Sequence, residues 1–260
     1  MNRPLRVVQL TDTHLFADPR QTLLGCPTWE TLQQVVAQVV VYDPDLVLLT
    51  GDLSQDESDA SYERLVAALQ LLSCPIYWLA GNHDAANPLE RILTTGGLCP
   101  DKRFQAGGWY FALLDSTLPG EVGGFLSPTV LAELATDLAQ HPEPTLIALH
   151  HPLFPVGSPW LDDSRVRNPE ALWSVLDAHP QVRVVLCGHV HQEHTWRRCG
   201  VTYYSTPSTC IQFAPQAATF ALDTAFPGFR WLELLPDGQH TSGVVRVPCS
   251  ITVDSGASGY

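Results

Sequence analysis

The stretch Gly81-Asn82-His83-Asp84 directly follows the apolar run Pro75-Ile76-Tyr77-Trp78-Leu79-Ala80. An apolar, aromatic run that ends in small residues predicts a buried strand that delivers polar groups into a tight turn. Asparagine, histidine and aspartate can together bind a metal, donate a proton and orient the donor. Because Gly-Asn also forms ordinary turns and Asp also caps helices, the rest of the chain has to decide between a plain turn and a reactive site.

The composition is that of a folded globule with an acidic surface. The chain has 260 residues, of which 45% are hydrophobic and 16% are charged, and this length is enough to bury a full core. Its formal net charge is −13, from 14 basic and 27 acidic residues. This balance argues against a general nucleic-acid or anionic-membrane binder, whose affinity depends on basic side chains. An anionic substrate would need local positive charge, which a bound metal can supply.

The cysteines and the N-terminal residues bear on the compartment. The 7 cysteines are scattered, with no Cys-x-x-Cys pair, which predicts reduced thiols rather than a disulfide framework or a zinc ribbon. Residues 1–8 pass directly into a strand-like segment without the apolar core of a signal peptide. No apolar run approaches the roughly 20 residues that a membrane span requires. We therefore expect a cytoplasmic protein with no membrane partner.

Strand-like and helix-like segments alternate through the first half of the chain. Buried strands are expected at 5–10, 45–50 and 75–80. A helix is expected to begin with Thr28 as its cap, and a second one spans 58–72. The buried face of the first helix is predicted to carry Leu32, Val35, Val36, Val39 and Val40. This alternation favours a mostly parallel sheet, in which functional groups lie beyond the carboxyl ends of the strands.

The second half continues this pattern and then changes to short strands. Strands are expected at 109–115, 145–149 and 182–187, and helices at Ser127-Pro128 and Asn168-Pro169. The later strands are expected at 195–198, 201–205, 219–222, 229–234 and 243–247, with Pro236-Asp237-Gly238 as a hairpin turn. No repeat or linker divides the chain. We expect a single domain over 1–260, with 248–260 as a loosely ordered tail.

Five of the expected strands end in residue types that bind metals. These residues are Asp12 and His14, Asp52, Asn82 and His83, His150, and His189 and His191. Each of them alone has an ordinary interpretation as a turn or surface residue, but an α/β sheet brings such strand ends to one edge. Residues two apart in an extended segment point to the same side, so each Asp-x-His or His-x-His pair can converge on one ion.

This donor set indicates two metal ions. Four imidazoles, two carboxylates and one amide oxygen are too many for one tetrahedral zinc. They suit two ions roughly 3.5–4 Å apart that share a carboxylate, as in phosphoester-cleaving sites. The absence of thiolate ligands argues against a closed structural zinc site. Mixed imidazole and carboxylate ligation suits iron, manganese or zinc without choosing among them.

The order of these motifs resembles that of the calcineurin-like metallophosphoesterase superfamily. The motifs are Asp12-x-His14, Gly51-Asp52, Gly81-Asn82-His83-Asp84, His150 and Gly188-His189-x-His191. Segments between them, such as Leu10–Ala17, Trp160-Leu161-Asp162 and Thr206–Cys210, are similar to the bacterial 3′,5′-cyclic AMP phosphodiesterases of the CpdA type, class III. The resemblance covers nearly the whole chain. It implies an α/β fold, a four-layer α/β/β/α sandwich with two packed mixed sheets flanked by helices.

The resemblance also implies a role for each site residue. One ion would be held by Asp12, His14, Asp52 and His191, and the second by Asp52, Asn82, His150 and His189. The expected cofactors are two divalent ions, iron or manganese with zinc as an alternative. Substrate contacts are expected from His14, Asp52, Asn82, His83 and His191. His83 is expected to be the catalytic proton donor, with Asp84 holding its ring. Some relatives have three consecutive histidines before the proline, whereas this chain has His150-His151-Pro152. His151 therefore has no assigned role.

The implied activity is hydrolysis of 3′,5′-cyclic AMP to 5′-AMP by a metal-bridging hydroxide, which lowers intracellular cyclic AMP. The alternatives are the same chemistry on other nucleotide or small phosphate esters, and a non-catalytic interaction scaffold, which would be expected to lack some ligands. Trp160, Phe213 and the turn Thr206–Thr209 could hold a purine or simply pack under a loop. The expected partner is a small cyclic nucleotide and not a nucleic acid. The oligomeric state, monomer or homodimer, stays open.

Overall fold

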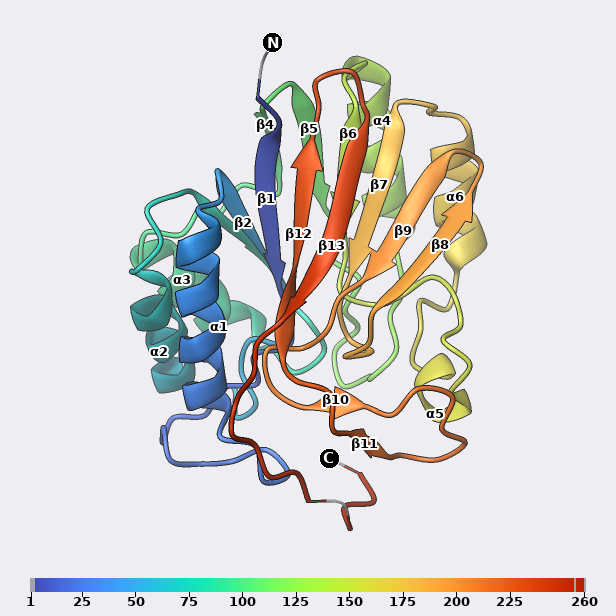
Figure 1. Ribbon diagram of the computed structural model, residues 1–260. Coiled ribbons are helices and arrows are strands. Elements are labelled where there is room, and N and C mark those ends of the chain that lie inside the picture. The colour runs from blue at the N-terminus through green and yellow to red at the C-terminus, as the bar shows by residue number, and fades with distance from the viewer. Residues whose placement is uncertain (1–2, 255, 260) are drawn as a thin grey trace.

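Two β-sheets pack face to face in the computed structural model, which describes residues 3–254 and 256–259 (Figure 1). The first sheet has the strand order β13-β12-β1-β2-β3. Its strands are β1 (Leu5–Leu10), β2 (Leu46–Thr50), β3 (Ile76–Leu79), β12 (Gly228–Leu234) and β13 (His240–Arg246). β1, β2 and β3 run parallel to one another, whereas β12 is antiparallel to both β1 and β13.

The second sheet has the strand order β4-β5-β6-β7-β9-β8. Its strands are β4 (Arg103–Ala106), β5 (Trp109–Leu113), β6 (Thr145–Ala148), β7 (Val182–Cys187), β8 (His194–Arg198) and β9 (Val201–Ser205). The central strands are parallel, and the edge strands β4 and β8 are antiparallel to their neighbours. A separate two-stranded ribbon is formed by β10 (Gln212–Phe213) and β11 (Leu222–Asp223).

Helices cover the outer face of each sheet. The first sheet carries α1 (Thr28–Tyr42), α2 (Asp59–Leu69) and α3 (Ala86–Thr95). The second sheet carries α4 (Pro128–Gln140) and α6 (Pro169–Asp177), while the one-turn helix α5 (Pro159–Asp162) lies in a loop near the ribbon (Figure 1). The predicted four-layer α/β/β/α sandwich with two mixed sheets is confirmed.

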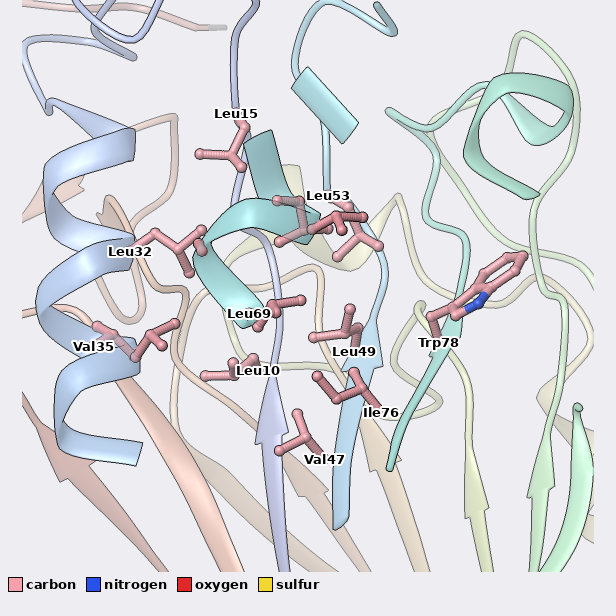
Figure 2. Packing of buried hydrophobic residues seen from close by; sticks show 14 of the residues in the cluster. Leu10, Leu15, Leu32, Val35, Val47, Leu49, Leu53, Leu69, Ile76 and Trp78 are labelled. Atoms are coloured by element: carbon pink, nitrogen blue, oxygen red, sulfur yellow. The ribbon is translucent and has the colours of Figure 1, made fainter. Parts of the chain in front are cut away.

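The strands are buried on both faces, which explains why their sequences are continuous apolar runs rather than alternating ones. Leu10 and Leu49 point toward the helices and belong to the same buried cluster as Leu32 of α1 and Leu69 of α2 (Figure 2). Val7 and Leu48 lie on the opposite face and pack between the sheets. Because side chains alternate along a strand, one run supplies two of the four layers. Full burial of each such side chain contributes about 1.5–3 kcal/mol.

Three of the four predicted helix starts are correct, including Asn168-Pro169 at α6, and the start of α1 is shifted by one residue. Ser58 caps α2 by accepting the N–H of Ser61, and Ser127 likewise caps α4. At α1, Pro27 is the N-cap and Thr28 is already the first helical residue. The side chain of Asn168 does not cap α6, because it bonds the backbone of residue 126. Val40, which was placed on the buried face of α1, is 42% exposed.

Four elements were not predicted from the sequence, and all of them except the ten-residue α3 are short. They are α3, β4, α5 and β10, and the strand expected at 219–222 is displaced to β11. Two-residue and four-residue elements hold too few side chains to establish a period. The hairpin turn at Pro236-Asp237-Gly238 is confirmed, since it joins β12 to β13 and Gly238 has a φ of 87°.

The last part of the chain runs along the first sheet and then toward the strand ends. Val247 and Cys249 are buried against α1–α3, and Ile251 packs beside them. Asp254 donates its backbone N–H to the carbonyl of Leu24 at 2.8 Å. The tail prediction over 248–260 includes residues 255 and 260, which lie outside the described residues. We propose that the chain forms a single domain, because the late strands β12 and β13 complete the sheet to which β1 belongs. Within the described ranges, no helix has the length and apolar character needed to cross a membrane.

Candidate metal centre

The carboxyl ends of strands from both sheets meet at one place. The first sheet supplies residues after β1, β2 and β3, and the second supplies residues after β6 and β7. These residues are Asp12, His14, Asp52, Asn82, His150, His189 and His191. Six of the seven are at most 4% exposed, and Asn82 is partly exposed. The donors predicted from the sequence therefore follow strands whose ends do converge, and these strands come from both sheets.

One group of donors consists of Asp12, His14 and His191. The Nε2 atom of His191 lies 3.4 Å from Asp12 Oδ1 and 3.3 Å from His14 Nε2. All three donor atoms lie within 4.8 Å of one another. This is the spacing expected of atoms that can share one ion, since metal–ligand bonds are about 2.0–2.2 Å long.

A second group of donors lies beside the first. His150 Nε2 is 3.2 Å from Asp52 Oδ2 and 3.2 Å from His189 Nδ1. Asp52 Oδ2 is also 3.8 Å from His14 Nε2, which belongs to the first group. The Asp52 carboxylate therefore lies between the two groups, where a shared ligand would have to lie.

Two buried oxygen atoms of this site lack hydrogen-bond partners among the described residues. They are Asp52 Oδ2 and Asn82 Oδ1. The other Asp52 oxygen, Oδ1, accepts the backbone N–H of His83 at 2.9 Å. Buried polar atoms are almost always paired, whereas in the described part of the chain Asn82 Oδ1 has no hydrogen-bond partner and Asp52 Oδ2 has the neighbouring His150 ring as its ionic partner. A divalent cation that binds both atoms satisfies them, and the residues present fit a dinuclear metal site.

Three of the histidines are oriented by hydrogen bonds on the ring nitrogen that faces away from the site. In each, Nδ1 donates to an oxygen: Gln55 Oε1 for His14 at 2.7 Å, the carbonyl of Thr50 for His150 at 2.8 Å, and the carbonyl of Ile211 for His191 at 2.8 Å. Because Nδ1 carries the proton of the neutral ring, Nε2 presents its lone pair to the site whenever the ring is neutral. Such partners typically fix both the tautomer and the ring orientation of a metal ligand.

Two of the histidines are already neutral at pH 7, as metal binding requires, and a third is not. Burial lowers the pKa of His14 to about 3 and the pKa of His189 well below its usual value, so both rings are neutral at pH 7. At His150, burial also favours the neutral ring, but the neighbouring Asp52 carboxylate outweighs it and raises the pKa to about 9. Despite burial, the His150 ring holds the pKa of Asp52 well below its usual range.

Five of the donor residues have left-handed backbone conformations. Their φ values are 55° for Asp12, 45° for His14, 52° for Asp52, 69° for His189 and 48° for His191. The Asp-x-His and His-x-His pairs therefore converge through turns, and not through the extended backbone that the spacing argument assumed. Left-handed conformations are unfavourable for residues other than glycine and cluster at functional sites.

Two glycines allow the strand ends to approach one another. Gly51 has a φ of 93°, and a Cβ atom there would lie 2.7 Å from the backbone nitrogen of Gly81. A Cβ atom on Gly81 would collide with the carboxylate of Asp52. Both positions therefore require glycine for the turns after β2 and β3 to come this close.

His151 has both ring nitrogens engaged away from the site. Nε2 donates to the carbonyl of Val122 at 3.0 Å, and Nδ1 therefore accepts the hydroxyl of Ser116 at 2.8 Å. Burial lowers the pKa of this ring to about 3. These contacts support the choice of His150 as the ligand, even though one nitrogen of His151 lies close enough to the second group to be counted with it.

Asp84 contacts groups other than the His83 ring. Its carboxylate accepts the backbone N–H groups of Leu53, Ser54 and Gly81 and the hydroxyl of Tyr62. This differs from the expectation that Asp84 orients the His83 ring. The carboxylate instead ties the turn after β2 to the turn after β3, and burial followed by the nearby Asp52 charge raises its pKa to about 7.

A cavity of about 490 Å³ opens beside the site. Asn82, His83 and His189 line its inner end, and Trp160, Phe213 and Phe220 form an aromatic wall. Of the candidates for holding a purine, Trp160 and Phe213 do reach the cavity. Thr206 instead lies in the core, where it bonds Gln9 and Arg230.

The sequence did not reveal several residues that line this cavity. They are Glu121, Ser164, Phe220, Ser258 and Gly259 among others. Ser164 and Glu121 lie in loops rich in proline and glycine, where no periodic pattern marks a functional side chain. Only the three-dimensional structure identifies these residues, because it places their loops beside the motif residues.

The family model of the calcineurin-like phosphoesterases matches residues 5–193. The chain therefore belongs to this family. It is 44% identical over 254 residues to the 3′,5′-cyclic-nucleotide phosphodiesterase alr5338 of Nostoc sp. (strain PCC 7120), and 96% of each chain is covered. It is 41% identical over 258 residues to the 3′,5′-cyclic adenosine monophosphate phosphodiesterase CpdA of Pseudomonas aeruginosa, covering 98% of this chain and 94% of that one.

A solved structure agrees with the fold. A dimetal phosphatase from Danio rerio superposes with a TM-score of 0.65 at 18% identity, covering 95% of this chain and 100% of that chain. At this identity the likeness concerns the fold alone. The curated relatives and the family model together place the chain among the metallophosphoesterases, as its motif order predicts.

Proposed function

We propose that this chain is a dinuclear-metal phosphodiesterase that hydrolyses 3′,5′-cyclic AMP to 5′-AMP. The observation that carries the proposal is the buried Asp52 Oδ2, which accepts no hydrogen bond from the described residues and lies between two groups of imidazole and carboxylate donors. Relatives named as a 3′,5′-cyclic-nucleotide phosphodiesterase and a 3′,5′-cyclic adenosine monophosphate phosphodiesterase match at 44% and 41% identity over nearly the full length. A non-catalytic scaffold is disfavoured, because the complete donor set is present.

The proposed ligands follow the two groups of donors. One ion would be held by Asp12, His14, Asp52 and His191, and the other by Asp52, Asn82, His150 and His189. Imidazole and carboxylate ligands suit iron or manganese, with zinc as an alternative. When bound, such ions supply an activated water and positive charge at the phosphate. They would also offset the overall charge of −13, which otherwise repels the substrate.

His83 is the proposed proton donor to the leaving 3′ oxygen. It lines the cavity, and its ring lies edge-on to that of His14 with 5.1 Å between the ring centroids. Its backbone N–H donates to Asp52, and this hydrogen bond fixes the backbone from which the His83 ring extends beside the proposed metals. The other proposed substrate contacts are His14, Asp52, Asn82 and His191.

The cavity supports a small substrate. Its volume of about 490 Å³ lies within the range of roughly 300–1,000 Å³ that is common for small-molecule sites. Its lining includes the partly exposed ring of Trp160, a side chain of the kind that stacks on a nucleobase, whereas Phe213 is buried and stacks on His191. The acidic composition argues against a nucleic-acid substrate. We also propose a cytoplasmic location, in keeping with 7 free cysteines.

Product analysis tests this function. The metal-reconstituted protein is incubated with 3′,5′-cyclic AMP, 3′,5′-cyclic GMP, 2′,3′-cyclic AMP and bis(p-nitrophenyl) phosphate, and the products are separated by chromatography. We expect 5′-AMP as the sole product from 3′,5′-cyclic AMP. Cleavage of the artificial diester alone would refute the cyclic-nucleotide activity while leaving the metal centre intact. It would then favour the alternative, a phosphoesterase acting on other small esters.

A further inference from the structure

The hydroxyl of Ser164 joins a predicted metal ligand to a backbone carbonyl. Its Oγ atom lies 2.7 Å from His189 Nε2 and donates its proton to the carbonyl of Leu161 at 2.7 Å. Both side chains are buried, with Ser164 8% and His189 4% exposed. A hydroxyl has one proton, and Leu161 receives it. The remaining contact requires that His189 Nε2 carries a proton and donates to Ser164 Oγ.

This arrangement is the reverse of that at the other three histidines. His14, His150 and His191 direct Nε2 to the site and keep Nδ1 protonated on an oxygen. His189 directs Nδ1 to the site, 3.2 Å from His150 Nε2, and keeps Nε2 protonated on Ser164. Its tautomer is therefore set by a hydroxyl that could itself donate or accept. The Leu161 carbonyl removes this freedom by taking the hydroxyl proton.

The same turn also forms part of the cavity wall. Ser164 follows α5, and its backbone N–H closes the turn on Leu161 at 3.0 Å. Trp160, on α5, lines the cavity. The turn is held from within, because the Asp162 carboxylate accepts the N–H groups of Val156 and Gly157. The turn formed by α5 and Ser164 thus lines the cavity and also holds the predicted metal ligand His189 by a hydrogen bond.

We propose that Ser164 is a positioning residue that locks His189 in the Nε2–H tautomer, with Nδ1 directed at the second ion. This inference rests on the metal assignment of the proposed function, but not on the identity of the substrate. Without the hydroxyl, the His189 ring can rotate or exchange its proton to Nδ1, and either change removes a lone pair from the site.

The variant Ser164→Ala tests the proposal, and the chain offers a matched control. Ser158 precedes the same helix, is also fully buried, and its Oγ has no hydrogen-bond partner among the described residues. Manganese or zinc is titrated into each apo variant by calorimetry. We expect Ser164→Ala to weaken one of the two binding steps by about 10–100-fold and to leave the other unchanged. Ser158→Ala should leave both binding steps unchanged. Ser164→Thr, which keeps a hydroxyl at this position, should bind both ions as tightly as the wild type.

A second measurement needs no variant. The tautomer of each histidine in the wild-type apo protein is read from long-range ¹H–¹⁵N correlations of the ring. We expect His189 to be protonated at Nε2 and His14 at Nδ1. Protonation of His189 at Nδ1, equal weakening of both binding steps, or the same loss in Ser158→Ala would overturn the proposal. No substrate is used, so a failure here is distinct from a failure of the phosphodiesterase activity.

Discussion

The backbone N–H of His83 donates to Oδ1 of Asp52 at 2.9 Å. This single bond fixes the rotation of the carboxylate and leaves Oδ2 for the space between the two groups of donors. It also joins the turn after β2 to the turn after β3. The proposed proton donor and the proposed bridging ligand are therefore placed by one contact, and the two can be separated only by substitutions that change one side chain at a time.

Replacement of the bridging carboxylate should affect both ions. We expect Asp52→Ala to lose most of the metal from both sites, because the variant removes a ligand from each and leaves His150 without its counter-charge. Elemental analysis of the purified protein measures the metal content. Asp59→Ala, which removes an exposed carboxylate paired with Arg91, is the control and should retain both ions. Full occupancy in Asp52→Ala would show that Asp52 is not the bridge.

Loss of the proposed proton donor should depend on the leaving group. We expect His83→Ala to keep both ions and to slow hydrolysis of 3′,5′-cyclic AMP by about 10²–10⁴-fold, the usual contribution of a general acid. Hydrolysis of bis(p-nitrophenyl) phosphate should slow much less, since p-nitrophenolate leaves without a proton. The ratio of the two rates is the measurement. An equal loss on both substrates would assign His83 to binding or to metal retention.

Metal binding should release a proton from His150. The pKa of this ring in the metal-free site is about 9, so the ring is protonated at pH 6, and a metal ion requires it neutral. His14, with a pKa of about 3, is already neutral at that pH and releases none. We expect about one proton per protein from His150 at pH 6, with the release fading as the pH rises through about 9. Calorimetry in two buffers of different ionisation enthalpy measures the release, and its absence at pH 6 would contradict the prediction.

The Asp84 carboxylate should stabilise the fold rather than tune His83. Asp84→Ala leaves three backbone N–H groups without their acceptor, and we expect it to lower the free energy of unfolding of the metal-free protein by roughly 2–4 kcal/mol. Tyr62→Phe removes one donor of Asp84 and also the acceptor of the Ala85 N–H, and it should cost roughly 1–2 kcal/mol. Urea unfolding measures both. A stable Asp84→Ala variant with altered pH dependence of turnover would instead favour the orienting role.

The sequence predicted the parts of the site that follow long apolar strands. Asp12, Asp52 and His150 each end a run that can only be a buried strand, and the sheet then brings such ends together. The prediction could not assign the contacts that Asp84 and Ser164 make. Which backbone donors surround a carboxylate depends on the relative placement of two turns, and this placement is a property of the packed sheets and not of any local pattern.

The left-handed backbone conformation of the donor residues lowers the stability of the folded, metal-free chain. An L-residue with a side chain pays roughly 1–2 kcal/mol to adopt this conformation, whereas glycine adopts it freely. Asp12, His14 and Asp52 therefore occupy positions where the metal-free chain would be more stable with glycine than with alanine. A glycine at any of these positions relieves this strain but removes a metal donor, so that a variant stabilised in this way would keep the fold and lose the metal centre.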